Sequence, residues 1–279
     1  MRAPSMPLKI LLDGPSASRA LLTRLHFAAQ MPLSCSSRDL VNDLTPPQVA
    51  RLLKFLSDLP EPQIRAIASR SYQHPLGFYK LILAQSSDTG EKLRLHVWRN
   101  QAPIDRRVED IHDHFWDFRS LVLIGHLRSE IYEECFVSST GTVACHAADL
   151  LPGDNGQFWI QRRGTACVRK VRTVSCESFQ SHSLTQGQLH RVIVTPDRMT
   201  ATLVLQGPRI AGRNRVFRSQ QSGTTLDSAG TSSVKYLTSP MTRRIFNDIQ
   251  SSISQAVDVG TCRSSSHATA DIPRRHAAG

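Results

Sequence analysis

Short segments with alternating apolar and polar residues follow one another through the middle of the chain, from Gly77 to Phe217. Examples are FYKLILAQ, KLRLHVWR, RSLVLIG, LRSEIYEE, HRVIVT and TATLVLQG, and they are bounded by Gly, Pro, Asp or Asn residues. A period of two residues is typical of strands that bury one face. Roughly eight to ten such segments occur with no helical pattern between them, which predicts an antiparallel sandwich or barrel rather than a parallel α/β sheet.

Helical patterns flank this region on both sides. Thr45 followed by two prolines predicts an N-capped helix, because the residues after it place apolar side chains three and four positions apart. A second helix opens at Glu61-Pro62 and ends before His74-Pro75. Helical spacing returns in residues 240–257, which predicts a terminal helix on the outside of the barrel.

These patterns divide the chain into five parts. We expect a flexible or targeting-like extension at 1–37, a helical subdomain at 38–76, a barrel at 77–218, a linker and C-terminal helix at 219–259, and a disordered tail at 260–279. The first part is rich in Ser, Ala, Arg and Lys and has one acidic residue, Asp13, a composition that resembles an organellar transit peptide. An upstream extension without function explains it equally well. The tail is small, polar and aperiodic, which predicts disorder.

The charge balance is basic, with 34 Lys and Arg against 23 Asp and Glu and a formal net charge of +11. Such proteins often bind nucleic acid or anionic membranes. The excess is spread along the chain, and its densest clusters, residues 162–163 and 209–218, contain no aromatic residue except Phe217. Because stacking on aromatic rings is typical of single-strand binding, we expect a solvated basic face and no nucleic-acid partner.

No apolar run approaches the roughly 18 to 20 residues of a membrane-spanning helix, so no membrane partner is expected. The six cysteines contain no Cys-x-x-Cys pair, which argues against a zinc ribbon and against a disulfide scaffold. We therefore expect reduced thiols and a cytoplasmic location, with organellar import as the alternative.

Two histidines in EDIHDHFWDF are the strongest signal of chemistry. His112 and His114 are two residues apart, and in a strand this spacing places both imidazoles on one face. A third imidazole from another strand would complete a facial metal site. His190 is the candidate, because it begins a β-branched run just after Gly187, and His182 is the alternative.

The stretch IHDHFWDFRSLVLIGHLRSEIYEE, with LRLHVW before it and LHRV after it, resembles the metal-binding core of the cupin superfamily, most closely the cysteine-dioxygenase type of thiol dioxygenase. The resemblance runs from about residue 77 to residue 217 and implies a mainly β fold, an antiparallel cupin or jelly-roll β-barrel with the helices at its flanks. It also implies Fe(II) held by His112, His114 and His190. Three neutral nitrogen ligands suit Zn, Ni, Mn or Cu as well.

The resemblance has departures that bear on the substrate. Lys80 stands where the cysteine-specific enzymes have a carboxylate-binding Arg, and Arg119 stands where they have a thioether-forming Cys. Their Ser-His-Tyr relay falls on Thr202, Val204 and Gln206. Phe118 occupies the position of the general cupin carboxylate, and Asp117, one residue earlier, is expected to point outward, with contact to the metal as the alternative. These substitutions argue against cysteine as the substrate but leave the metal site intact.

The predicted substrate contacts are Lys80, Arg94, His96, Trp116, Phe118 and Gln206. For His96, packing inside the barrel is an equally good explanation. We expect a mononuclear non-haem iron dioxygenase whose partners are dioxygen and a small anionic substrate such as a thiol or amino-acid derivative. The alternative is a metal-binding cupin without oxygenase activity, either an isomerase or lyase or a small-molecule sensor, since the fold alone does not separate these. The patterns predict no oligomeric state.

Overall fold

A computed structural model describes residues 44–74, 77–85, 90–99, 109–135, 141–152, 158–195, 198–208, 213–220 and 235–264. The predicted extension at 1–37 lies outside the described residues, as does 265–279 of the predicted tail.

Helices α3 (Pro46–Ser57), α4 (Glu61–Ala68) and α5 (Ser239–Ser264) flank the strands, as predicted. Thr45 begins α3 with a capping box, in which its backbone N–H donates to the Gln48 side chain at 2.7 Å. Helix α5 continues to Ser264, past residue 260, where the disordered tail was expected to begin. It passes through Gly260, which a sequence pattern treats as a helix end although a glycine inside a helix costs only about 1 kcal/mol. None of the described helices is long and apolar enough to cross a membrane.

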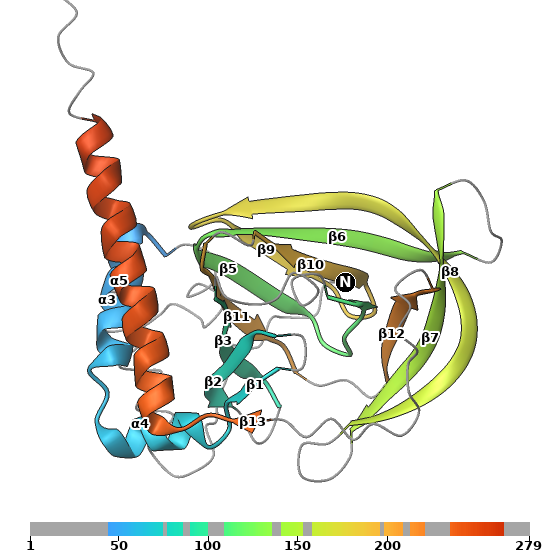
Figure 1. The fold of residues 1–279 in the computed structure, drawn as a ribbon, viewed down its shortest axis with the longest axis horizontal. Coiled ribbons are helices and arrows are strands. Elements are labelled where there is room, and N and C mark those ends of the chain that lie inside the picture. Colours follow the sequence, from blue (N-terminus) through green and yellow to red (C-terminus); the bar gives the residue numbers. More distant parts are fainter. Residues whose placement is uncertain are drawn as a thin grey trace, which may run out of the picture.

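The strands form two antiparallel sheets. One is seven-stranded, with the order β13-β1-β2-β3-β11-β5-β9, and the other closes into a ring with the order β10-β4-β12-β7-β8-β6 (Figure 1). Within them, β3, β11, β5 and β9 lie in the first sheet while β4, β10, β6 and β8 lie in the second, which is the jelly-roll order of two Greek keys. The predicted fold class, a mainly β antiparallel barrel with flanking helices, is confirmed. The strand bounds are β1 (Tyr72–Gln73), β2 (Tyr79–Gln85), β3 (Lys92–Trp98), β4 (Ile111–His112), β5 (Phe118–Ile124), β6 (His126–Cys135), β7 (Thr142–Pro152), β8 (Phe158–Glu177), β9 (Ser181–Leu184), β10 (Leu189–Val194), β11 (Thr200–Gln206), β12 (Asn214–Ser219) and β13 (Lys235–Tyr236).

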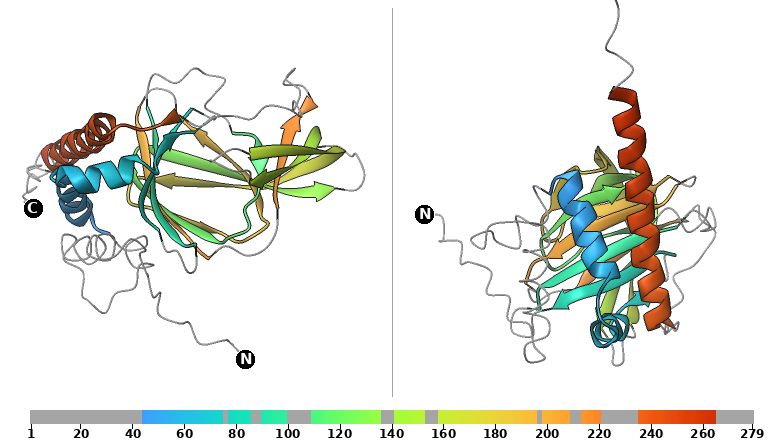
Figure 2. Two further views of the ribbon diagram at one scale, coloured as in Figure 1. Left: turned by 90° about the horizontal axis from the view of Figure 1, so that it is seen from below. Right: turned by 90° about the vertical axis from the view of Figure 1, so that its left-hand side faces the viewer.

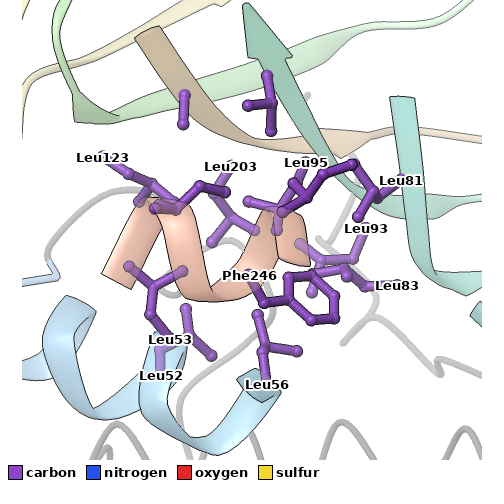
Figure 3. Packing of buried hydrophobic residues seen from close by; sticks show 14 of the residues in the cluster. Leu52, Leu53, Leu56, Leu81, Leu83, Leu93, Leu95, Leu123, Leu203 and Phe246 are labelled. Atoms are coloured by element: carbon purple, nitrogen blue, oxygen red, sulfur yellow. The ribbon is translucent and has the colours of Figure 1, made fainter. Parts of the chain in front are cut away.

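The two faces of the seven-stranded sheet differ in chemistry. Its outer face is covered by α3 and α5, which lie side by side over the strands (Figure 2). Alternate residues of β2, β3, β5 and β11 supply buried leucines to this interface, where they meet Leu52, Leu53, Leu56 and Phe246 of the helices (Figure 3). The leucines are Leu81, Leu83, Leu93, Leu95, Leu121, Leu123, Leu203 and Leu205. The largest apolar core therefore lies between the sheet and the helices. The opposite face has a smaller apolar cluster, which includes Phe78, Trp98 and Val122, and leaves room for polar side chains beside it.

Gly125 marks the point where the chain passes from the seven-stranded sheet into the closed ring. Its φ is +86°, and a Cβ there would lie 2.5 Å from the carbonyl oxygen of Met199. Any other residue at this position would be strained. Its backbone would have to adopt a left-handed conformation, and its Cβ would clash with the Met199 carbonyl oxygen. The crossing keeps β5 and β6 in different sheets, as the jelly-roll order requires.

The closed ring has a small apolar cluster of its own and a buried carboxylate beside it. The cluster consists of Ile111, Tyr132, Cys145, Ala147, Val168, Leu189 and Phe217. Glu130 is 4% exposed and accepts hydrogen bonds from the Tyr132 hydroxyl at 2.7 Å and from Nε of Arg191 at 2.6 Å. Burial acts to raise the pKa of Glu130, but these bonds and one from Lys170 outweigh it and lower that pKa to about 2.

Replacing Glu130 with Gln should lower the free energy of unfolding near neutral pH by about 3 kcal/mol, because the stabilised charge is lost. A carboxyl group whose pKa is depressed in the folded state stabilises the fold above its unfolded value and loses that contribution as the pH falls through its folded value. For Glu130 the pKa is about 2 in the folded state, compared with the ordinary value of 4.5 in the unfolded chain. The gap between wild type and Glu130→Gln should therefore shrink in denaturation curves taken from about pH 7 to about pH 3.

The matched control is Glu133→Gln, which removes an exposed carboxylate paired with Arg169. Its cost should stay below about 1 kcal/mol. A gap for Glu130→Gln that does not change with pH would contradict the assignment.

Candidate metal centre

The structure brings His112, His114 and His190 together. His112 lies on β4 directly opposite His190 on β10, and His114 follows two residues after His112. Their ring centroids are 4.4 Å apart for His112 and His190, 4.9 Å for His112 and His114, and 5.2 Å for His114 and His190. One nitrogen of each ring lies within 4.8 Å of the others, a grouping that can hold a metal ion.

Backbone carbonyls orient two of the three rings. Nδ1 of His112 lies 2.8 Å from the carbonyl oxygen of Asp110, and Nδ1 of His190 lies 3.3 Å from that of Gln188. A carbonyl only accepts, so Nδ1 carries the proton in each ring and Nε2 keeps its lone pair for a ligand. Burial lowers the pKa of His114 and of His190 well below the ordinary histidine value. Both are therefore neutral imidazoles, the form that binds metals.

His114 supports the fit of a metal in a different way. Its Nδ1 is buried and has no hydrogen-bond partner in the described part of the chain. The ring stacks on Trp116, with centroids 5.1 Å apart and planes 15° apart. Three nitrogen donors, two of them oriented by carbonyls and one held by an aromatic ring, form a set that suits a divalent transition metal.

Arg215 on β12 joins the two segments that carry the ligands. Its backbone N–H and its Nε donate to the two carboxylate oxygens of Asp113, each at 2.6 Å. A second guanidinium nitrogen donates to the carbonyl oxygen of Gly187 at 3.1 Å. Asp113 stands between His112 and His114, and Gly187 precedes His190 by three residues. Arg215 therefore holds both ligand segments in one arrangement.

The three histidines open onto a cavity between the two sheets. Its volume is about 70 Å³. Neither Lys80 nor Arg94, which both line it, has an ion-pair partner within 4.0 Å in the part of the chain that the structure describes. The full lining is His74, Phe78, Lys80, Arg94, His96, Trp98, Glu109, His112, His114, Phe118, Ser120, Leu127, His182, His190, Val192, Thr202 and Val204.

The cations are buried, and burial sets their properties. Desolvation, with a smaller contribution from Arg94, lowers the pKa of Lys80 well below the ordinary lysine value. Desolvation also lowers the pKa of Arg94 to about 10, so its guanidinium stays charged near neutral pH. The guanidinium of Arg94 lies 5.8 Å from the centroid of the Trp116 ring, a cation–π contact. A buried positive charge without a carboxylate partner favours an anionic ligand.

Four of the six predicted substrate contacts line this cavity, namely Lys80, Arg94, His96 and Phe118. Trp116 and Gln206, although they are described residues, are outside its lining. Trp116 packs behind His114 instead, and Gln206 donates to the carbonyl oxygen of Gly90 at 3.3 Å. Gln206 lies on the same side of β11 as Thr202 and Val204, but it is the last residue of the strand and lies beyond the cavity.

Sequence reasoning missed two titratable residues of the cavity, His74 and Glu109. A carboxylate oxygen of Glu109 lies 3.9 Å from Nε2 of His112, and burial raises the pKa of Glu109 above its ordinary value. A carboxylate three residues before a His-x-His pair is a usable signal for Glu109, whereas nothing local marks His74.

His182, the alternative ligand, lines the cavity on β9 but is not part of the histidine group. Asp117 is outside both, and its carboxylate accepts from the backbone N–H of Gln186 at 2.7 Å.

Neither the scan of protein-family models nor the search of curated proteins found a match to this chain. Solved structures with a similar arrangement include the cupin domain of CENP-C from Drosophila melanogaster, at 8% identity and a TM-score of 0.31, covering 49% of this chain and 74% of that one. The EutQ protein of Clostridium difficile matches at 12% identity and a TM-score of 0.28, covering 47% and 68%. Hydroquinone 1,2-dioxygenase from Sphingomonas matches at 11% identity and a TM-score of 0.26, covering 43% and 60%.

Replacing Arg215 with Met should weaken metal binding about tenfold, because the groups that orient metal ligands typically change affinity by this much. The measurement is a competition titration of the metal against a chromogenic chelator. Arg213→Met is the control, since Arg213 lies two residues away on the chain and pairs instead with Asp149. Equal affinities for the two variants would show that Arg215 does not position the ligands.

Proposed function

We propose that the protein is a mononuclear non-haem iron dioxygenase that acts on a small anionic molecule such as a thiol or an amino-acid derivative. The observation that carries the proposal is the juxtaposition, in one small cavity, of the three-histidine group with the buried basic side chains of Lys80 and Arg94. Bound Fe(II) would supply open coordination positions at which a substrate and dioxygen meet.

The two cations would bind and orient the substrate. They lie on neighbouring strands, with Lys80 on β2 directly opposite His96 and Arg94 two residues before His96 on β3. Nε of Arg94 is buried without a hydrogen-bond partner in the described residues, so a donor is available to a substrate oxygen. An Arg donor pairs with carboxylates in a directional way, whereas Lys acts as a point charge. The pair therefore favours a ligand with a carboxylate or a comparable anionic group.

Further polar atoms in the lining match a substrate with additional hydrogen-bonding groups. Nε2 of His96 and Oγ1 of Thr202 are buried, and neither has a partner in the described part of the chain. The two residues are cross-strand neighbours of β3 and β11, so both face the same part of the cavity. Leaving such atoms unpaired is costly, which supports a polar ligand in contact with them.

Aromatic side chains would keep bulk water away from the reacting groups. Phe118 lies 5.4 Å from the His114 ring and 5.6 Å from the His190 ring, between centroids. Phe78 and Trp98, whose rings are 5.0 Å apart, line the cavity and are both 4% exposed. Exclusion of water strengthens the electrostatic interactions of the cations with an anion.

One observation favours the alternative of a metal-dependent isomerase or lyase. The Glu109 carboxyl group faces the same cavity, and its raised pKa makes it able to hold or release a proton at its carboxylate oxygen. A proton-transfer reaction needs such a group, whereas a dioxygenase whose substrate ionises on binding does not.

The first test is metal content. The wild-type protein, purified without oxygen and loaded with Fe(II), should hold about one iron per chain by elemental analysis, and His112→Ala should lose it. His182→Ala is the control, because His182 lines the same cavity outside the histidine group. Wild-type metal content in folded His112→Ala would exclude the ligand assignment.

The second test is oxygen uptake with a panel of small thiols, amino acids and other small carboxylates. Lys80→Met should raise KM for the active substrate about tenfold or more and leave the iron content unchanged, because it removes a buried amine that would donate to the anionic group of the substrate. The control is Lys54→Met, which changes an exposed lysine of α3 that pairs with Asp58. It should have the KM of the wild type. Conversion of a substrate without oxygen uptake would favour the isomerase or lyase instead, and bound zinc or nickel with no oxygen uptake would exclude the dioxygenase.

A further inference from the structure

Two cysteines face each other across neighbouring strands of the closed ring. Cys135 is the last residue of β6, and Cys167 lies in the middle of β8. The antiparallel register of these strands makes the two residues direct Cα partners. Both thiols are free and partly exposed in this structure.

The geometry of a directly opposed antiparallel pair is compatible with a disulfide. Opposed residues have Cα atoms about 4.5 to 5.5 Å apart, and their side chains lie on the same face of the sheet. Disulfides span Cα separations of about 4.4 to 6.8 Å. A bond between Cys135 and Cys167 therefore requires rotation of the side chains and no rearrangement of the backbone.

Cys135 and Cys167 also differ in burial from Cys145 and Cys176. Cys145 and Cys176 are buried, and burial raises the pKa of Cys145 to about 11 and raises that of Cys176 as well. Thiols held protonated in this way are poor nucleophiles. Cys135 and Cys167, by contrast, are partly exposed, so a small oxidant can reach them.

We propose that Cys135 and Cys167 form a reversible disulfide that links β6 to β8. With a small oxidised disulfide such as oxidised glutathione, one protein thiolate attacks a sulfur of the oxidant and releases one glutathione thiol. The second protein thiolate then attacks the mixed disulfide at the protein sulfur, forms the Cys135–Cys167 bond and releases the second glutathione thiol. The protein loses two electrons and two protons, and the oxidant becomes two thiols.

The link would act on the ring that carries two of the metal ligands. It ties the end of β6 to β8, and the middle of β6 pairs with β10, where Ile131 is the Cα partner of His190. Closing the chain between residues 135 and 167 restricts the unfolded state and so stabilises the fold. We expect oxidation to raise the melting temperature and to leave the metal ligands in place.

The test uses the full-length chain with Cys35 and Cys262 changed to Ser, which leaves Cys135, Cys145, Cys167 and Cys176 as the four thiols. Treatment with oxidised glutathione should remove two of these thiols, lower the intact mass by two hydrogens and yield a peptide that joins Cys135 to Cys167. Dithiothreitol should reverse all three changes. The melting temperature of the oxidised form should be higher by about 5 °C or more.

Cys135→Ser and Cys167→Ser should each abolish the bond and the rise in melting temperature, and Cys176→Ala should keep both. Stable glutathione adducts on Cys135 without a link to Cys167 would overturn the proposal. A crosslink that persists in Cys167→Ser would also overturn it, as would equal melting temperatures of the oxidised and reduced forms.

Discussion

The packing of α3 and α5 against one face of the seven-stranded sheet is the constraint on which the rest of the molecule depends. Helices α3 and α5 cover one face and bury the leucines of alternate strand positions, so the main hydrophobic core lies outside the barrel. In most two-sheet folds the core lies between the sheets. Because the helices supply much of that burial here, the space between the sheets needs only a small apolar cluster and can also hold Lys80, Arg94 and His96.

The closure of the second sheet has a corresponding effect on the metal centre. Strand β4 is only two residues long, and it is held between β10 and β12. His112 on β4 and His190 on β10 project toward the cavity, whereas their neighbours Ile111 and Leu189 belong to the apolar cluster of the ring. Strand β12 also carries Arg215, which binds Asp113 and the Gly187 carbonyl. The ring therefore places the ligands and supplies the residue that holds their segments.

Much of the architecture could be predicted from local patterns. The period of two residues located the strands, and the capping signal at Thr45 located the start of α3, because both depend on neighbouring residues alone. The pairing of the histidines could be anticipated in part, since the spacing of His112 and His114 and the strand start at His190 are visible in the sequence. The cavity was harder to predict. An inward-facing residue lines the cavity only if it lies at the right position along its strand. Thr202 and Gln206 point to the same side of β11, but only Thr202 lines the cavity.

The sequence by itself determined the antiparallel strands, the flanking helices and the three histidines as a candidate site, because these follow from residue type and short-range spacing. Only the tertiary structure decided which side of the sheet holds the core, that Lys80 and Arg94 share the cavity with the histidines, and that Glu109 and His74 join them. It also decided that Cys135 opposes Cys167. These features depend on the register between strands far apart in the chain, and register is set by side-chain packing across the whole fold rather than by any local segment.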